Sequence, residues 1–330
     1  MEQEISLITK YLARCPLCDG SIRKTYGGLR DRFDTTSEYF DIFTCLECGI
    51  HFTNPLPRGN LGILYPSLYL SSSRDPEFKK STSAGLERWY RENQYAFDFS
   101  LFEKASGVAI RGMRSYLDIG CGTGERINYV RERGCEKVFG IDSFECFNVE
   151  LDKEKYFRAT ETLLFNPQEK YHVVSLFHVL EHIINPSDVI DHIASNILED
   201  GGYLILQVPN YHCIERSIFR ERWFCFDVPR HLWHFTPSFL HNLLDQRSWR
   251  VLRVYQSNST LHPVSLVPSI HKDLDIQRIW IQANRNPGVY WSLMKFLWIL
   301  LTLCSVPSNV LQSLFNRASM LTVVARNATR

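Results

Sequence analysis

A glycine-rich turn after a short apolar run constrains this chain more than any other segment. Residues 116–119 have the composition of a buried strand, and Gly120, Gly122 and Gly124 allow a sharp turn with no Cβ atoms between the backbone and a ligand. The next predicted strand ends at Asp142, whose carboxylate can accept hydrogen bonds from both hydroxyls of a ribose. The pattern of strand, glycine turn, helix and strand therefore predicts a nucleoside-binding site.

Strand and helix patterns alternate along most of the chain. Strands are predicted over 115–119, 137–141, 171–176, 202–208, 250–257 and 319–325, and helices over 84–112, 124–133, 144–154 and 186–198. This alternation predicts an α/β domain with a doubly wound, Rossmann-like parallel sheet. The 330 residues are enough for one such domain and a smaller module.

Two details distinguish this turn from a dinucleotide-binding fingerprint. Glu125 stands where that fingerprint needs a third glycine, and Asp118 precedes the turn. Carboxylates repel a pyrophosphate but attract a sulfonium and an ammonium group. The segment resembles the first motif of class I S-adenosylmethionine-dependent methyltransferases, acidic-x-Gly-x-Gly-x-Gly. A nicotinamide-dependent oxidoreductase is the weaker alternative.

The resemblance implies a seven-stranded sheet whose last strand is antiparallel and inserted between its neighbours. It also implies that Asp118 and the glycines surround the methionyl part of S-adenosylmethionine, while Asp142 binds the ribose. The expected cofactor-binding residues are Asp118, Gly120, Cys121, Gly122, Gly124, Asp142, Phe177 and His178. The chain departs from the family pattern at His172 and at 159–161, which weakens the prediction of the adenine contacts.

A first histidine cluster, His178-Val-Leu-Glu181-His182, follows the strand predicted over 171–176. The string also matches H-x-x-E-H, a zinc-protease signature that needs both histidines on one continuous helix. Pro186 begins the next helix shortly afterwards, so we expect these residues on a loop instead. The resemblance agrees, since many small-molecule methyltransferases carry a Val-Leu-Glu-His element after their fourth strand.

A second cluster contains Pro-Arg230-His231-Leu-Trp-His-Phe. The resembled family has a similar run after its fifth strand, facing the methyl acceptor. A hydroxyl or acidic carbon must lose a proton on methylation, and histidine is the usual base near neutral pH. We expect His182 as the base, with His231 as the second candidate, and His178 and Glu181 orienting the cofactor or acceptor.

Two C-x-x-C pairs near the N-terminus predict a metal site. Cys15 and Cys18 form one pair, and Cys45 and Cys48 form the other. Their separation is slightly longer than is common for a tetrahedral zinc site, and the alternating segment between them predicts a zinc ribbon. Four thiolates leave no open coordination position, so the zinc is expected to be structural.

The expected organisation is a zinc-ribbon module at 1–60, a helical linker or lid at 61–112, and a methyltransferase domain at 113–330 with insertions at 210–236 and 258–316. Within the resembled family, the chain is most similar to small-molecule and glycan methyltransferases that carry such a ribbon. This resemblance implies a small-molecule, sugar or glycan-linked acceptor as the partner, as in polysaccharide biosynthesis. A scaffold that binds cofactor without turnover is the alternative from another functional class.

A strongly apolar segment, 289–306, lies in the second insertion and is marginal beside the length of a membrane span. Burial in the core or in a homodimer interface is one expectation, and peripheral contact with a membrane is another. The net charge of +1 does not suggest a nucleic-acid partner. The first residues lack the apolar run of a signal peptide, so a cytoplasmic enzyme is expected.

Overall fold

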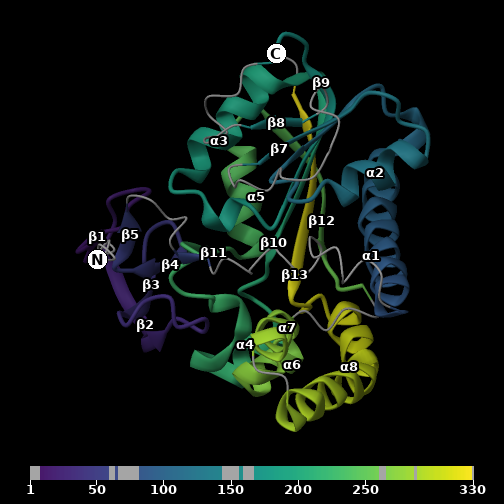
Figure 1. The fold of residues 1–330 in the computed structure, drawn as a ribbon. Coiled ribbons are helices and arrows are strands. Elements are labelled where there is room, and N and C mark those ends of the chain that lie inside the picture. The colour runs from purple at the N-terminus through teal and green to yellow at the C-terminus, as the bar shows by residue number, and fades with distance from the viewer. Residues whose placement is uncertain are drawn as a thin grey trace, which may run out of the picture.

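The computed structural model describes residues 8–58, 64–65, 82–142, 156–158, 167–259, 265–285 and 288–328. A mixed sheet forms the centre of the molecule, with strand order β12-β13-β10-β9-β6-β7-β8 (Figure 1). Its strands are β6 (Tyr116–Ile119), β7 (Val138–Asp142), β8 (Tyr156–Arg158), β9 (Tyr171–Phe177), β10 (Leu198–Pro209), β12 (Trp249–Gln256) and β13 (Met320–Asn327). The predicted α/β fold is confirmed.

β13 lies between β10 and β12 and is antiparallel to both. Val323 stands opposite Leu206 on one side and Val254 on the other. The strand sequence Met320–Asn327 is rich in β-branched residues and almost wholly buried, as expected for an interior strand. Its position agrees with the placement implied by the resemblance.

Helices cover both faces of the sheet, because neighbouring strand residues point to opposite sides. α1 (Thr82–Ser106) and α2 (Glu125–Glu132) pack on the face that contains Tyr116 and Val173. α3 (Pro186–His192) and α5 (Pro237–Asp245) pack on the face that contains Leu117 and Val174. The doubly wound arrangement predicted from the alternation of elements is therefore present.

The helix predicted over 186–198 is shorter than expected. α3 passes into a π-helical turn, Ile193–Ile197, and β10 already begins at Leu198. The helix predicted over 144–154, the segment 159–161 and most of 61–81 lie outside the described residues. Thr236 caps α5 as its sequence indicates, because its Oγ1 accepts a hydrogen bond from the Phe239 N–H at 3.2 Å.

The N-terminal segment forms a small antiparallel sheet in the order β11-β4-β3-β2. Its strands are β2 (Ile22–Arg30), β3 (Tyr39–Cys45), β4 (His51–Asn54) and β11 (Trp233–His234), while β1 (Ile8–Lys10) pairs with β5 (Leu56–Arg58). β11 comes from the predicted insertion at 210–236, and its Trp233 pairs with Phe52. The N-terminal sheet therefore includes a strand from the second half of the chain.

The remaining helices gather at the end of the molecule below the sheet (Figure 1). They are α4 (Ile214–Phe219), α6 (Leu266–Ile270), α7 (Ile276–Arg285) and α8 (Val289–Leu314). Pro307 lies inside α8, which continues through this proline to Leu314. Burial in the core is wrong for α8, because only 6% of its most apolar 18-residue window is buried.

Candidate functional site

The glycine turn connects β6 to α2 at the carboxyl end of the strand. Gly120 has φ +76° and Gly122 has φ +54°, a left-handed conformation that suits glycine. A Cβ atom on Gly120 would come within 2.2 Å of Val179, so the turn packs tightly against the loop after β9. A Cβ atom on Gly122 would meet no described atom within 4 Å. The backbone at Gly122 thus borders open space in the described structure.

Asp142 ends β7 beside this turn. Its Oδ2 accepts a hydrogen bond from the Gly122 N–H at 2.8 Å, which fixes the carboxylate next to the glycine backbone. The parallel pairing of β6 with β7 brings the two segments to the same edge of the sheet. This arrangement is the one that a ribose-binding carboxylate requires, and the assignment of Asp142 to the ribose stays a prediction.

Asp118 is buried within the strand and takes part in a charged cluster. Its Oδ1 accepts a hydrogen bond from Ser175 Oγ at 2.6 Å, and its Oδ2 lies 3.9 Å from Arg126 Nη1. Burial raises the pKa of Asp118, and the charge of Arg126 opposes that rise. Asp98 on α1 also lies near Arg126, at 3.7 Å. The predicted contact of Asp118 with the methionyl group stays a prediction.

Arg126 is a site-forming residue that sequence reasoning missed. It is the second residue of α2, and its guanidinium stacks over the ring of Phe177 at 3.7 Å from the centroid. Arg126 thereby connects α1, the glycine turn and the end of β9. Cys121 and Phe177, both expected near the cofactor, are buried beside these residues in one apolar cluster. An arginine at the start of a helix gives no sequence signal of such a role.

The predicted loop after β9 is confirmed. His178 has φ +58°, and the following residues form a three-residue 3₁₀ turn, Leu180–His182, before α3 begins at Pro186. The zinc-protease signature requires both histidines on successive turns of one helix, and His178 and His182 do not lie in this way. Glu181 is fully buried, and its Oε1 lies 3.7 Å from His178 Nδ1.

His231 lies beside His182, with ring centroids 4.7 Å apart. The backbone holds them together, because Leu232 N–H donates to the Glu181 carbonyl at 2.8 Å. Burial, followed by the nearby His231, lowers the pKa of His182 to about 4. The two histidine clusters predicted from the sequence thus form one cluster in the fold, with Glu181 between them.

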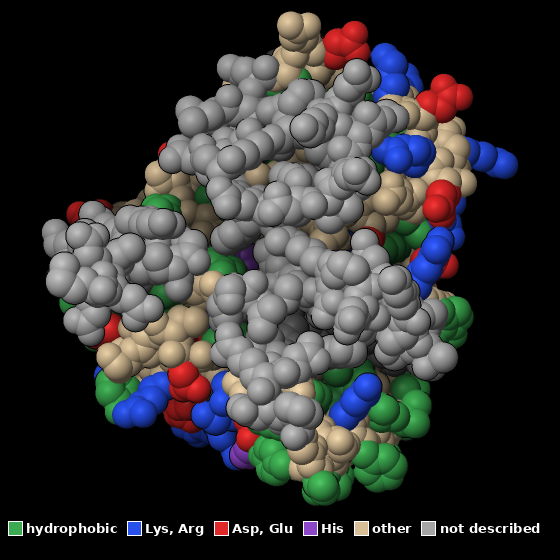
Figure 2. Space-filling model, viewed as in Figure 1, with side chains coloured by type: hydrophobic (Ala, Val, Ile, Leu, Met, Phe, Trp, Pro, Cys, Tyr) green, Lys and Arg blue, Asp and Glu red, His purple; other side chains and the backbone are tan. Residues whose placement is uncertain are grey.

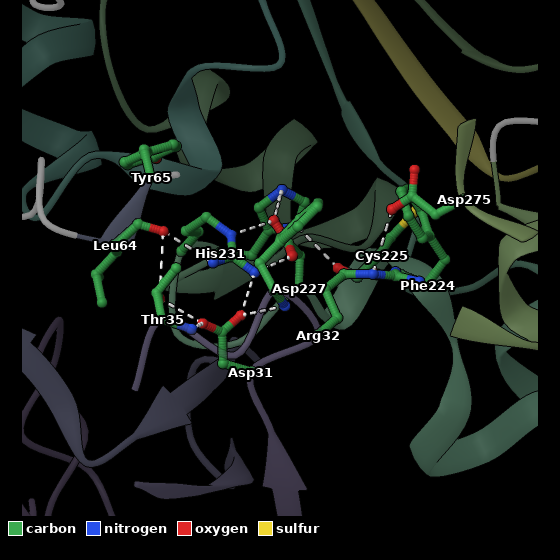
Figure 3. A network of polar contacts seen from close by, with 12 residues as sticks. Asp31, Arg32, Thr35, Leu64, Tyr65, Phe224, Cys225, Asp227, His231 and Asp275 are labelled. Atoms are coloured by element: carbon green, nitrogen blue, oxygen red, sulfur yellow. Dashed lines mark hydrogen bonds and ion pairs between the residues drawn. The ribbon is translucent and has the colours of Figure 1, made fainter. Parts of the chain in front are cut away.

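A buried network of ion pairs and hydrogen bonds lies beside His231 (Figure 3). Arg230 donates two hydrogen bonds to Asp227, at 2.6 and 3.0 Å, and another to Asp31 at 2.6 Å. Asp31 follows β2 of the N-terminal sheet, while Asp227 precedes His231 in the same loop. The N-terminal sheet is therefore part of the scaffold that positions His231.

The four paired cysteines meet at one end of the N-terminal sheet. Cys15 Sγ lies 3.8 Å from Cys48 Sγ, and Cys18 Sγ lies 3.5 Å from Cys45 Sγ. Sulfurs bound at about 2.3 Å to one tetrahedral zinc ion lie roughly 3.8 Å apart, so the spacing fits that ion. The chain turns directly after each pair, with positive φ at Asp19 and Gly49.

Comparison with protein families identifies the central domain. A family described as a methyltransferase domain matches residues 87–254, slightly more than half of the chain. The chain belongs to this methyltransferase family. The expected enzyme class, an S-adenosylmethionine-dependent methyltransferase, is confirmed at the level of the family. The match begins in α1 and ends in β12, so it includes the glycine turn and both histidine clusters of this methyltransferase.

Solved structures that resemble this chain do so at low identity and low TM-score. A methyltransferase from Archaeoglobus fulgidus is 16% identical, with a TM-score of 0.44 and coverage of 74% of this chain and 100% of that chain. The plantazolicin methyltransferase BpumL in complex with SAH is 18% identical, with a TM-score of 0.43 and coverage of 80% and 95%. These scores are low, so the assignment relies on the family match. No curated protein matches the chain.

Proposed function

We propose that this protein transfers the methyl group of S-adenosylmethionine to a hydroxyl or carbon of a small-molecule, sugar or glycan-linked acceptor. The supporting observation is the meeting of the glycine turn with the histidine cluster at the carboxyl edge of the sheet. Gly120 packs directly on Val179, the neighbour of His178, so a cofactor at the turn would lie beside the histidines. The family match supplies the reaction class.

The transfer itself needs alignment more than chemical activation. A sulfonium gives up its methyl group by in-line displacement, and the thioether leaves without protonation. Holding acceptor and cofactor in line can supply about 7 kcal/mol or more of the rate advantage. Asp142 and the backbone at Gly122 would hold the nucleoside, while the loop from His178 to His182 and the segment at His231 would face the acceptor.

The acceptor also has to lose a proton. The histidine cluster offers three candidates, and the lowered pKa of His182 makes it a weaker proton acceptor than a histidine of ordinary pKa. His178 and His231 stay the other two candidates for this step. Replacing the true base by alanine should lower turnover by about 10²-fold or more and leave cofactor affinity unchanged.

Calorimetric titration with S-adenosylhomocysteine tests the proposal. Wild-type protein should bind it, and Asp142→Asn should weaken binding by about 10-fold or more, because a hydrogen bond to a charged group is lost. Asp188→Asn, at an exposed position of α3, is the matched control. Failure of the folded, zinc-loaded protein to bind would overturn the proposal. Binding without label transfer from deuterated cofactor to any extract would favour the scaffold alternative.

We also propose that the cysteine cluster holds one structural zinc ion, bound by Cys15, Cys18, Cys45 and Cys48. The four thiol groups lie within 4.8 Å of one another. Cys45→Ser should remove the bound zinc and lower the melting temperature, because a structural zinc site contributes folding free energy. Cys304→Ser, an exposed cysteine outside the cluster, should change neither. Unchanged metal content in Cys45→Ser would refute the assignment.

For α8 we propose contact with the surface of an anionic membrane, reached from the cytoplasm. The polar side chains of this helix, Ser305, Asn309 and Gln312, face the protein, and Gln312 donates a hydrogen bond to Glu215 at 3.1 Å. The apolar side chains face outward: Phe296 and Leu303 are each 62% exposed. Figure 2 shows hydrophobic side chains gathered at the lower edge of the molecule, where Figure 1 places α8. An ordinary surface helix packs its apolar face on the protein and exposes its polar face, so the two faces of α8 are reversed.

Charge favours a lipid surface over a second copy of the chain as the partner of α8. The sequence contains no Asp or Glu after Asp275, whereas Lys295 lies within the apolar face and Arg317 follows the helix. A two-fold dimer through this face would bring like charges together without acidic partners from the segment. Anionic headgroups would instead attract Lys295 and Arg317. The helix is long and apolar enough to span a membrane, but its packed polar face suits an interfacial position better.

A further inference from the structure

Three side chains of the histidine cluster converge in a way that proton transfer alone does not explain. One ligand atom each from Glu181, His182 and His231 lies within 4.8 Å of the other two. Two of these residues belong to the 3₁₀ turn after β9, and His231 comes from the loop before β11. The hydrogen bond from Leu232 N–H to the Glu181 carbonyl fixes the two segments side by side.

Both histidines use the same ring nitrogen for the backbone. His182 Nδ1 lies 3.0 Å from the Arg230 carbonyl oxygen, and His231 Nδ1 lies 2.8 Å from the Cys225 carbonyl oxygen. A carbonyl oxygen can only accept, so a neutral ring carries its proton on Nδ1 and its lone pair on Nε2. Tyr65 Oη also lies 3.1 Å from His182 Nδ1, where it can accept, and Asp227 Oδ2 lies 3.9 Å from His231 Nε2. Metal-binding histidines are oriented in this way by a carbonyl on the opposite nitrogen.

Within the described part of the chain, the carboxylate of Glu181 has no donor in hydrogen-bond geometry. The residue is fully buried, and neither carboxylate oxygen accepts a hydrogen bond from any residue that the structure describes. The nearest cationic candidate is His178 Nδ1, at 3.7 Å from Oε1. A buried carboxylate without hydrogen bonds is costly, and a bound cation is one of the ways in which proteins compensate for it.

We propose that Glu181, His182 and His231 bind a divalent first-row transition-metal ion. Two neutral imidazoles and one carboxylate suit such ions, in contrast to the thiolate set of the cysteine cluster. Ligand atoms at about 2.1 Å from an ion lie roughly 3 to 3.5 Å apart, so binding would draw the ligand atoms together by about 1.8 Å at most. Three protein ligands leave coordination positions open for an acceptor oxygen.

This inference rests on the proposed methyl transfer and adds a means of activating the acceptor. A cation lowers the pKa of a bound hydroxyl, so the oxygen can release its proton near neutral pH. The proton would be released to water. The oxygen then forms its bond to the methyl carbon as the carbon–sulfur bond breaks and the neutral thioether leaves.

Manganese titration tests the site without relying on activity. Full-length, zinc-loaded protein is titrated with Mn²⁺, which prefers nitrogen and oxygen ligands to thiolates, and free Mn²⁺ is counted by electron paramagnetic resonance. Wild-type protein should bind one Mn²⁺ per chain. Glu181→Gln and His231→Gln should each weaken binding by about 10-fold or more. Glu221→Gln and His241→Gln, both at exposed positions, should bind as wild type does.

Absence of wild-type binding at millimolar Mn²⁺, or unchanged binding in both site variants, would overturn the inference. If Glu181→Gln fails to fold, the more exposed His231 position decides the outcome. Calorimetry with S-adenosylhomocysteine on the same samples separates this inference from the proposed function. Cofactor binding without Mn²⁺ binding would remove only the metal site, whereas loss of cofactor binding in the wild-type protein would contradict the methyltransferase proposal itself.

Discussion

Arg230 is fully buried between carboxylates from distant parts of the chain. Its guanidinium contacts Asp227 through two nitrogens, contacts Asp31 through one, and donates to the Leu64 carbonyl at 2.9 Å. Burial alone would raise the pKa of Asp227, but the charge of Arg230 holds it well below the ordinary value. The planar fork of arginine matches these acceptors in a way that a lysine ammonium cannot.

Removing this guanidinium should destabilise the protein severely. Arg230→Met leaves two buried carboxylates without their cation, for which we expect a loss of about 3–5 kcal/mol in the free energy of unfolding. Arg230→Lys keeps a charge but loses the two-point contact, so it should recover only part of that loss. Urea unfolding measures both, with Arg222→Lys at an exposed position as the control. A loss below about 1 kcal/mol in Arg230→Met would contradict this account.

His51 should make the stability depend on pH. Burial, followed by the charge of Arg216, lowers its pKa from 6.5 to about 3, and its ring stacks on Tyr211 at 3.7 Å. The unfolded chain therefore takes up a proton at a higher pH than the folded one, and stability is lost as the pH falls below about 6.5. His51 should contribute about 2 kcal/mol of this loss between pH 8 and pH 5. His51→Phe keeps an aromatic ring but cannot take up a proton, so it should remove this part of the pH dependence. Unfolding curves at both pH values measure the effect. An equal change in the free energy of unfolding between pH 8 and pH 5 in both proteins would refute the prediction.

Among the elements, the two-residue strand β11 connects the N-terminal sheet with the loop after β9. Trp233 pairs with Phe52 of β4 and donates an indole hydrogen bond to the Ile183 carbonyl at 2.7 Å. Thr53 Oγ1 donates to the His231 carbonyl at 2.6 Å on the other side. This short strand therefore lies between the N-terminal sheet and the loop that carries His182, and it sets the position of the segment at His231.

The exposed apolar surface of α8 predicts that the protein binds to membranes. The protein should float with liposomes that contain anionic lipid, and added salt should weaken the binding because Lys295 and Arg317 contribute. Replacing Phe296, Leu300 and Leu303 by glutamine should abolish flotation, since each buried apolar side chain contributes about 1.5 kcal/mol or more. The melting temperature should stay unchanged, because all three side chains are exposed.

Leu46→Gln is the matched control for α8, since this side chain is 58% exposed on the N-terminal module. It should float as the wild-type protein does. A wild-type protein that stays in the soluble fraction as a monodisperse dimer, and becomes a monomer in the triple variant, would assign the apolar face to self-association instead.

At the scale of the whole molecule, the N-terminal sheet and the central sheet share one core. Phe43 and Phe52 from the former belong to the same buried cluster as Leu176 and Leu206 from the latter. The Arg230 network adds a second connection between these parts. Two regions that share buried apolar surface are expected to unfold together.

A single unfolding transition should therefore be observed. With cobalt in place of zinc, the absorbance of the metal–thiolate bonds reports on the cysteine cluster, while far-ultraviolet circular dichroism reports mainly on the central sheet and its helices. The two thermal transitions should coincide. Separate transitions would show that the N-terminal module is an independent domain.

The sequence by itself determined the elements and the chemistry that depends on local spacing. Alternating patterns predicted the strands on either side of the glycine turn, because side chains of neighbouring strand residues face opposite sides. The C-x-x-C pairs predicted the thiol cluster because each pair needs only a local turn, and the two pairs meet through β2 and β3, which are neighbours in the chain. The segment from His178 to His182 was correctly expected on a loop, since Pro186 starts a new helix.

Tertiary structure alone decided which distant groups meet. No local pattern places Asp31 against Arg230, or joins His182, Glu181 and His231 in one cluster, because these contacts depend on how strands pair across the chain. Its composition also could not show which face of α8 points outward, because an apolar helix suits a core and a membrane surface equally. Only the packing of Ser305, Asn309 and Gln312 against the protein shows that the apolar face is left outside.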